Sequence, residues 1–204
     1  RAAVYLINKE IPQSTIISGQ FTVSKNNPDF YAFTVMDFIA GSGGFPSRIL
    51  STVRNNEGLA YSAGSFYRAK PGYGFFGSYA FTKTSSTMKA LSLLDSVLED
   101  IQSDSVTARE LDWAKKAIND GFIFSFSTSE QIVWQQMNIE YEKLPPDFLI
   151  NYRNQIDRVT LKDLNNAADK YLDKKKNVVL ILGDSKKLDH PPPAGGFTLI
   201  TPEE

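Results

Sequence analysis

The sequence predicts an α+β fold, a two-layer domain with one largely antiparallel sheet covered by helices. Three observations support this prediction. Strand-like segments come in pairs within the first 82 residues, the stretch from Thr84 to about Leu172 has helical spacing almost throughout, and an apolar strand-like run follows at 177–182. The 204 residues suffice for one large domain, and we find no internal repeat or domain boundary in them.

The first two strands are predicted at residues 4–9 and 14–21, with a turn between them. A helix follows, because Asn27 can cap it and Pro28 suits its first position. Gly41 is expected to end this helix. Its apolar positions recur at helical spacing and predict the face that it buries: Ala32, Val35, Met36 and Ile39.

A second helix is predicted from the cap Ser47 to Gly58, with an apolar stripe that predicts its buried side. Two strands follow at residues 59–67 and 73–81, and the Pro-Gly pair between them is typical of a type II turn. One face of the second strand is expected to lie under the helices, and its aromatic side chains are Tyr73, Phe75, Tyr79 and Phe81.

The long helical stretch is divided by three capping-box signatures: Thr107 with Glu110, Ser127 with Glu130, and Thr160 with Asp163. The two prolines within residues 144–147 are expected to break it once more. The run at 177–182 reads as a buried closing strand. We assign residues 1–190 to a single domain and residues 191–204 to an irregular C-terminal tail. A chain that starts at Arg1 is expected to be a piece of a longer protein.

The composition excludes several classes of function. Lys and Arg total 22 and Asp and Glu total 23, so the net charge of -1 lacks the basic excess that nucleic-acid binding needs. No apolar run approaches the length of a membrane span. The absence of cysteine excludes a disulfide framework and is compatible with the cytoplasm and the periplasm alike, so the localisation stays open.

The residues available for chemistry are few. His190 is the one histidine, in a proline-rich tail, so no zinc site or Ser-His-Asp triad is expected in this chain. The glycine-rich segment at 40–48 lacks the spacing and the lysine of a phosphate-binding loop, and it follows a helix. No pair of carboxylates stands out. The sequence therefore predicts no catalytic residue, metal or cofactor within the chain.

Arg54 and Tyr61 are the remaining candidates, seven residues apart across a helix-turn-strand junction. A guanidinium and a phenol that converge there offer hydrogen-bond donors for a peptide carbonyl or an oxyanion. The alternative is structural: Arg54 pairs with an acid such as Glu57, and Tyr61 packs. Residue chemistry alone leaves both possibilities open.

Several segments together resemble one family. Residues 36–65, MDFIAGSGGFPSRILSTVRNNEGLAYSAGS, resemble the glycine-rich loop, Ser-Arg helix and R-x-x-x-G-L-A-Y-S segment of the pitrilysin-type zinc peptidases. This inverzincin family includes insulin-degrading enzyme and the mitochondrial processing peptidases. The similarity continues in order through VTARELDWAKKAI, IDRVTLKDLNNAADKYL, NVVLILGD and LDHPPPAGGFTLI, so it covers nearly the whole chain.

The resemblance has specific implications. The family is built from homologous halves, of which one binds zinc through H-x-x-E-H and a later glutamate. This chain lacks that motif and resembles the non-catalytic, C-terminal-type half. The resemblance implies that Arg54 and Tyr61 bind the substrate, that a catalytic half is the partner, and that zinc lies in that partner. The alternative is a structural or assembly homologue without a role in proteolysis; a free-standing enzyme with carboxylate chemistry is a third possibility.

Overall fold

The computed structural model of the chain describes residues 3–103, 106–190 and 196–200. Its centre is one sheet of six strands in the order β3-β4-β2-β5-β1-β6. The strands are β1 (Ala3–Asn8), β2 (Gln13–Thr22), β3 (Ala60–Ala69), β4 (Gly74–Lys83), β5 (Val178–Gly183) and β6 (Thr198–Ile200). The pairs β3–β4, β4–β2 and β2–β5 are antiparallel, whereas β1 is parallel to both β5 and β6. The sheet is therefore mixed, with antiparallel pairing for most of its width.

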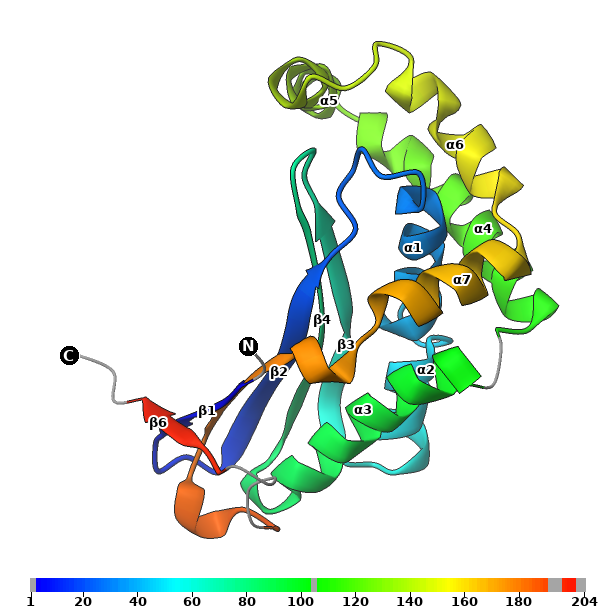
Figure 1. Ribbon diagram of the computed structural model, residues 1–204. Helices are drawn as coiled ribbons and strands as arrows, with labels where there is room; N and C mark the ends of the chain where they lie inside the picture. The colour runs from blue at the N-terminus through cyan, green and yellow to red at the C-terminus, as the bar shows by residue number, and fades with distance from the viewer. Residues whose placement is uncertain (1–2, 104–105, 191–195, 201–204) are drawn as a thin grey trace.

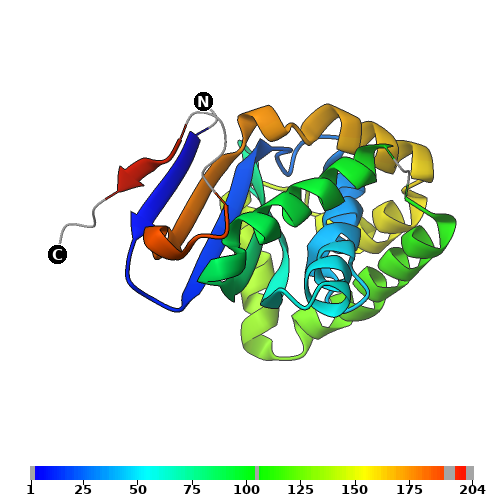
Figure 2. The same cartoon turned by 90° about the horizontal axis from the view of Figure 1, so that it is seen from below.

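The second layer consists of helices. They are α1 (Phe30–Asp37), α2 (Arg48–Leu50), α3 (Thr87–Ser103), α4 (Ala108–Phe122), α5 (Ser129–Glu142), α6 (Phe148–Arg158) and α7 (Leu161–Tyr171). Most of them lie on one side of the sheet and leave its other side open (Figure 1). The end of the sheet that carries β1 and β6 projects beyond the helices (Figure 2). The predicted α+β fold with one helix-covered sheet is confirmed.

The first two helices bury the faces that their spacing predicts: Ala32, Val35, Met36 and Ile39 in the first, and Ile49, Leu50 and Val53 in the second. Their ends differ from the prediction. α1 begins at Phe30, and the side chain of Asn27 accepts a hydrogen bond from the Asp29 amide outside the helix. Its path continues past Gly41 as a π-helical turn, η1 (Phe38–Ser42). The spacing of apolar residues does not predict a π-turn, because its one extra residue changes which side of the helix the following residues face.

The second helix also continues as a π-helical turn, η2 (Ser51–Asn56), and the chain then reverses at Gly58, whose φ is +63°. That left-handed conformation favours glycine, as the predicted helix end requires. Ser47 stands at the N-cap position, but its hydroxyl donates to the Gly44 carbonyl at 2.6 Å and does not cap the helix amides.

Two of the three predicted capping boxes are confirmed, at Thr107 with Glu110 and at Thr160 with Asp163. The prediction for Ser127 with Glu130 is wrong by one residue. The box at the start of α5 joins Thr128 and Gln131 instead. Ser and Thr are adjacent here, and Glu and Gln both suit the third helical position, so the signature alone allows either register.

The predicted burial of the β4 aromatics is wrong. The helices cover the alternate set of residues, in which Phe76, Ser78 and Ala80 are at most 2% exposed. Tyr73, Phe75 and Phe81 are exposed, and Tyr79 is half-buried, on the open side. Small side chains on the covered side let the helices approach the strand closely. Period-two spacing separates the two faces of a strand but does not say which face the helices cover.

We expected residues 191–204 to form an irregular tail, but part of this segment is a strand. Thr198–Ile200 form β6, which adds to the free edge of β1 and satisfies backbone groups there. Residues 191–195 and 201–204 lie outside the described part of the chain. The division into a domain at 1–190 and a tail remains an expectation.

Helix α5 stands apart from the other helices, beyond the tip of the β3–β4 hairpin (Figure 1). Its last residue, Glu142, is almost fully buried and forms ion pairs with Lys25 and Lys70, the latter at 2.7 Å. Lys25 follows β2 and Lys70 lies in the hairpin turn. These contacts fix the C-terminal end of α5 to the sheet. A buried carboxylate without those cations would be strongly destabilising, so this position of α5 is specified by charge.

Candidate functional site

The turn at Gly58 brings the two predicted site residues together. Arg54 lies in η2 and Tyr61 in β3, where the register shift between Ala60 and Ser62 makes Tyr61 the extra residue of a bulge. The guanidinium carbon of Arg54 is 5.9 Å from the centre of the Tyr61 ring and 5.1 Å from that of Phe45. Arg54 therefore makes cation–π contacts with two aromatic rings.

The structure does not contain the ion pair of Arg54 with Glu57 that the structural alternative predicts. Glu57 forms an ion pair with Lys89 at 2.9 Å and not with Arg54. Within the described residues, Arg54 has no hydrogen bond or ion pair to another side chain. The Tyr61 side chain is 83% exposed. Both groups can thus donate hydrogen bonds to a molecule outside the chain.

A hollow of about 280 Å³ adjoins this pair. It lies between the glycine-rich segment and the outer strand β3, and Arg54, Ser62, Arg68 and Tyr79 line it. The sequence did not indicate Arg68 or the neighbouring Phe45 as site residues, and it predicted Tyr79 to lie under the helices. Arg68 and Tyr79 both lie on the open side of the sheet. Tyr79 had been predicted on the covered side of its strand, and no face of the strand that carries Arg68 had been assigned. A correct assignment of the open face would have identified both.

Asp37 lies behind the hollow and ties its two walls together. The Ser65 hydroxyl of β3 donates to the Asp37 carboxylate at 2.6 Å and to its carbonyl at 3.1 Å. Burial raises the pKa of the Asp37 carboxyl to about 6, against the lowering effects of hydrogen bonds from Ser65 and Ser42 and of the Arg68 charge. The carboxyl therefore links α1, the glycine-rich segment and β3.

This pKa predicts a pH dependence of stability. The folded-state pKa of about 6 exceeds the ordinary value of 3.8, so the folded chain holds this proton more tightly than the unfolded chain. The stabilisation is complete below pH 4 and is lost as the pH rises to about 6, on the order of 3 kcal/mol. We expect Asp37→Asn to remove this loss, which denaturant unfolding from pH 4 to 7 would measure.

Asp112→Asn, an exposed change on α4, is the matched control and should leave the pH profile unaltered. Parallel profiles for wild type and Asp37→Asn would show that Asp37 does not titrate in this range.

Comparison with known proteins identifies the family. The model of the peptidase M16 inactive domain matches residues 2–118, more than half of the chain. The chain belongs to this family. A relative from Helicobacter pylori, described as the non-peptidase homolog YmxG, is 27% identical over 89% of this chain and 42% of its own length. An uncharacterized zinc protease of Mycobacterium leprae is 24% identical over 88% of this chain and 40% of its own length.

The crystal structure of a peptidase M16 inactive domain from Pseudomonas fluorescens has the same fold. It superposes with a TM-score of 0.83 at 25% identity, over 91% of this chain and 44% of that one. The chain thus spans about two fifths of the length of the curated relatives that it matches.

The described part of this M16 inactive domain offers no set of side chains that fits zinc. In the ranges that the structure describes, no three His, Cys, Asp or Glu side chains gather where they could hold a metal ion. His190 follows β5 and the short helical turn after it, and its side chain is exposed. Its neighbour Asp189 accepts hydrogen bonds from the Met88 and Lys89 amides at the start of α3. No described helix is both long and apolar enough to cross a bilayer.

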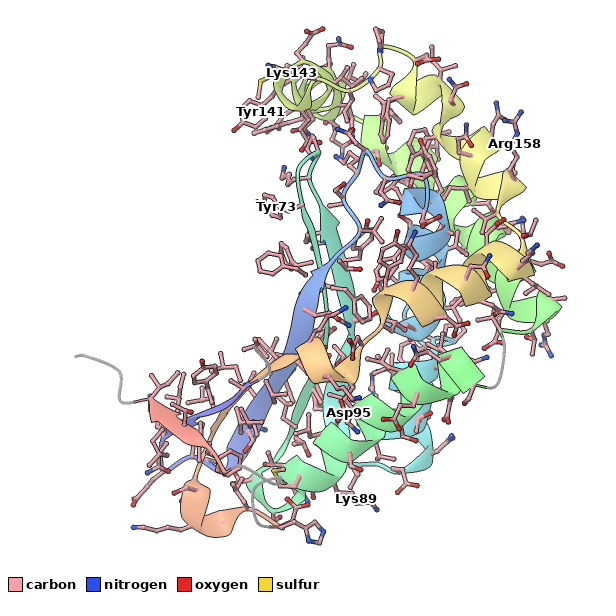
Figure 3. The ribbon with its side chains drawn as sticks, viewed as in Figure 1. Tyr73, Lys89, Asp95, Tyr141, Lys143 and Arg158 are labelled. Carbon is pink, nitrogen blue, oxygen red and sulfur yellow. The ribbon has the colours of Figure 1, made fainter. Side chains whose placement is uncertain are left out.

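The open sheet face of this M16 inactive domain is rich in exposed apolar side chains: Ile17, Phe21, Phe75, Phe81 and Val178. Tyr73 projects to the same side (Figure 3). Contiguous exposed apolar surface of this kind is typical of a binding face. Arg54 and Tyr61 lie at the β3 edge of this face.

A second exposed apolar surface lies on α5, and we name it the α5 stripe: Val133, Trp134, Met137 and Tyr141, which are 49% to 82% exposed. Their spacing places them along adjacent rows of one helix. Tyr141 and Tyr73 project to the same side of the molecule (Figure 3). The α5 stripe and the open face are therefore both accessible from that side.

Proposed function

We propose that this M16 inactive domain is the substrate-binding half of a zinc metalloendopeptidase. It closes a peptide chamber against a catalytic half that carries H-x-x-E-H. The observation that carries the proposal is the junction of η2 and β3: Arg54 and Tyr61 converge at the edge of an open apolar sheet face, and both have free donors. A peptide presents a carbonyl for such donors and side chains for such a face.

The roles of the two residues follow from their chemistry. The guanidinium of Arg54 contacts the rings of Phe45 and Tyr61, and these contacts favour its position at the edge of the open face before a peptide arrives. The Tyr61 hydroxyl donates to the carbonyl oxygen on which negative charge develops. Zinc bound in the catalytic half would supply the activated water, and the described residues of this chain offer no ligand set for it.

The need for a partner is supported by the α5 stripe. Four exposed large apolar side chains in water are unfavourable, and their burial against a partner is the ordinary solution. In both relatives the part that matches this chain is less than half of the protein, so the larger part lies outside the match. We therefore place the catalytic half against the α5 stripe and above the open sheet face.

This placement gives a second prediction. Met137→Glu places a charge in the α5 stripe, where its burial is costly, and should weaken binding of the catalytic half at least about tenfold. Titration of one half into the other by calorimetry would measure it. Ile150→Glu is the matched control, because Ile150 is 77% exposed but lies on α6. Equal effects of the two changes would contradict the placement.

The function itself is tested by joining this chain to the H-x-x-E-H half encoded in the same reading frame or beside it. We expect no bound zinc and no peptide cleavage from this chain alone. The joined halves should hold one zinc per pair and cleave peptides. One tightly bound zinc in this chain alone, unaffected by His190→Ala, would contradict the assignment.

The alternative is an assembly homologue that has no role in proteolysis. One observation favours it: the Helicobacter pylori relative is described as a non-peptidase homolog. This alternative predicts that the two halves assemble but do not cleave peptides, or that no H-x-x-E-H half is encoded with this chain.

A further inference from the structure

The hollow beside Arg54 contains a second arginine. Arg68 lies on β3 six positions after Ser62, and alternate residues of a strand face the same side. Ser62, Phe66 and Arg68 therefore form one row, and all three line the hollow together with Arg54. An extended peptide along β3 would pass from Arg54 over Phe66 to Arg68.

The charge of this hollow is unbalanced. None of its described lining residues is acidic. Arg68 donates one hydrogen bond, at 3.3 Å to the Tyr67 carbonyl, and forms no ion pair within the described ranges. Asp37 interacts with Arg68 only through its charge, because its oxygens accept from the hydroxyls of Ser65 and Ser42. Two guanidinium groups thus line a hollow with one buried acid behind it.

A guanidinium without a partner binds a carboxylate particularly well, because its planar fork can donate two parallel hydrogen bonds to the two oxygens. Arg68 is exposed and Phe66 beside it in the same row is half-buried, so a peptide can reach the guanidinium from the hollow. We propose that Arg68 is a specificity-determining residue that selects peptides with a carboxylate, from an acidic side chain or from the C-terminus. This proposal rests on the proposed function, since it concerns the same bound peptide.

The test is a binding comparison on this chain with three fluorescently labelled peptides of one sequence. One is neutral, with glutamine and an amidated end; the second has a single glutamate; the third has a free C-terminal carboxylate. Measured by anisotropy at about 50 mM salt, at least one carboxylate peptide should bind roughly tenfold more tightly than the neutral peptide. A gain for the second peptide assigns the side chain, and a gain for the third assigns the C-terminus.

Variants locate the effect. Arg68→Gln should abolish the advantage of the carboxylate peptide over the neutral peptide. Arg68→Lys should keep part of it, because an ammonium lacks the planar fork. Arg158→Gln is the control, since Arg158 is exposed at the end of α6, on the opposite side of the molecule from Tyr73 (Figure 3).

Three results would overturn the proposal: equal binding of all three peptides, equal loss of preference in Arg68→Gln and Arg158→Gln, or binding of none of them at millimolar concentration. The first two leave the proposed function intact if the joined halves still cleave the neutral peptide. Conversely, a carboxylate preference that depends on Arg68 would stand even if the joined halves cleaved nothing.

Discussion

Tyr61→Phe is expected to lower kcat of the joined peptidase by on the order of 10² to 10³, with the melting temperature unchanged. The change removes one hydroxyl and keeps the ring that contacts Arg54 at 5.9 Å. A donor that meets charge developing on the carbonyl acts mainly in the transition state, so kcat falls more than KM rises. The side chain is 83% exposed in this chain, and its hydroxyl therefore contributes little to folding.

The matched control is Tyr73→Phe. Tyr73 is also exposed on the open side, so the same hydroxyl is removed from the same face at another point. Turnover per folded molecule should not change in this variant. If Tyr61→Phe also retained full turnover, the hydroxyl would have no part in the reaction and the proposed role would be lost.

Arg54→Lys extends the same argument. The ammonium keeps the charge but cannot present the planar fork that contacts Phe45 and Tyr61. We expect reduced kcat with an unchanged fold. The structural alternative predicts the opposite for both residues, a loss of melting temperature with normal turnover, so measuring both on the same samples separates the two.

The architecture was predictable because it depends on spacing. Apolar positions at helical intervals identified the buried sides of the first two helices, and the structure buries these positions: Ala32, Val35, Met36, Ile39, Ile49, Leu50 and Val53. Period-two spacing likewise identified the β3–β4 hairpin. The convergence of Arg54 and Tyr61 followed from a helix, a glycine reversal at Gly58 and a strand, all of which are local features.

The part that could not be predicted depends on tertiary packing. Which face of β4 is covered is decided by helices distant in sequence, and the small residues Ser78 and Ala80 admit them. That one error had a consequence for the site. Because the two faces of β4 were exchanged, Tyr79 was predicted to be a core residue and Arg68 was not considered. The sequence therefore did not predict the hollow between the glycine-rich segment and β3.

The π-turn at the end of α1 shows the same limit. Gly41 was predicted to end the helix, but the structure requires glycine there because β3 lies so close. A β-carbon on Gly41 would lie 2.2 Å from the Ser65 amide nitrogen and 2.6 Å from the Gly64 carbonyl carbon. Glycine thus allows η1 to lie directly against β3. No local pattern in the sequence records an approach between segments more than 20 residues apart.

Gly41→Ala is therefore expected to destabilise the chain by about 3 kcal/mol or more. The two nearest atoms that an alanine methyl would meet belong to the backbone of β3, so a side-chain rotation cannot relieve the contact. Separation of η1 from β3 would also stretch the hydrogen bonds between Ser65 and Asp37. For a chain of this size the melting temperature should fall by roughly 6 to 12 °C. Thermal unfolding followed by circular dichroism would measure it.

Gly121→Ala is the matched control, because Gly121 lies within α4 and a β-carbon there would meet nothing within 4 Å. Alanine favours a helix over glycine by up to about 1 kcal/mol, so this variant should melt at the same temperature or slightly higher. The two changes add the same methyl group, and only its surroundings differ. If Gly41→Ala melted like Gly121→Ala, the close contact of η1 with β3 would be refuted, and with it the geometry of the hollow that Gly41 lines.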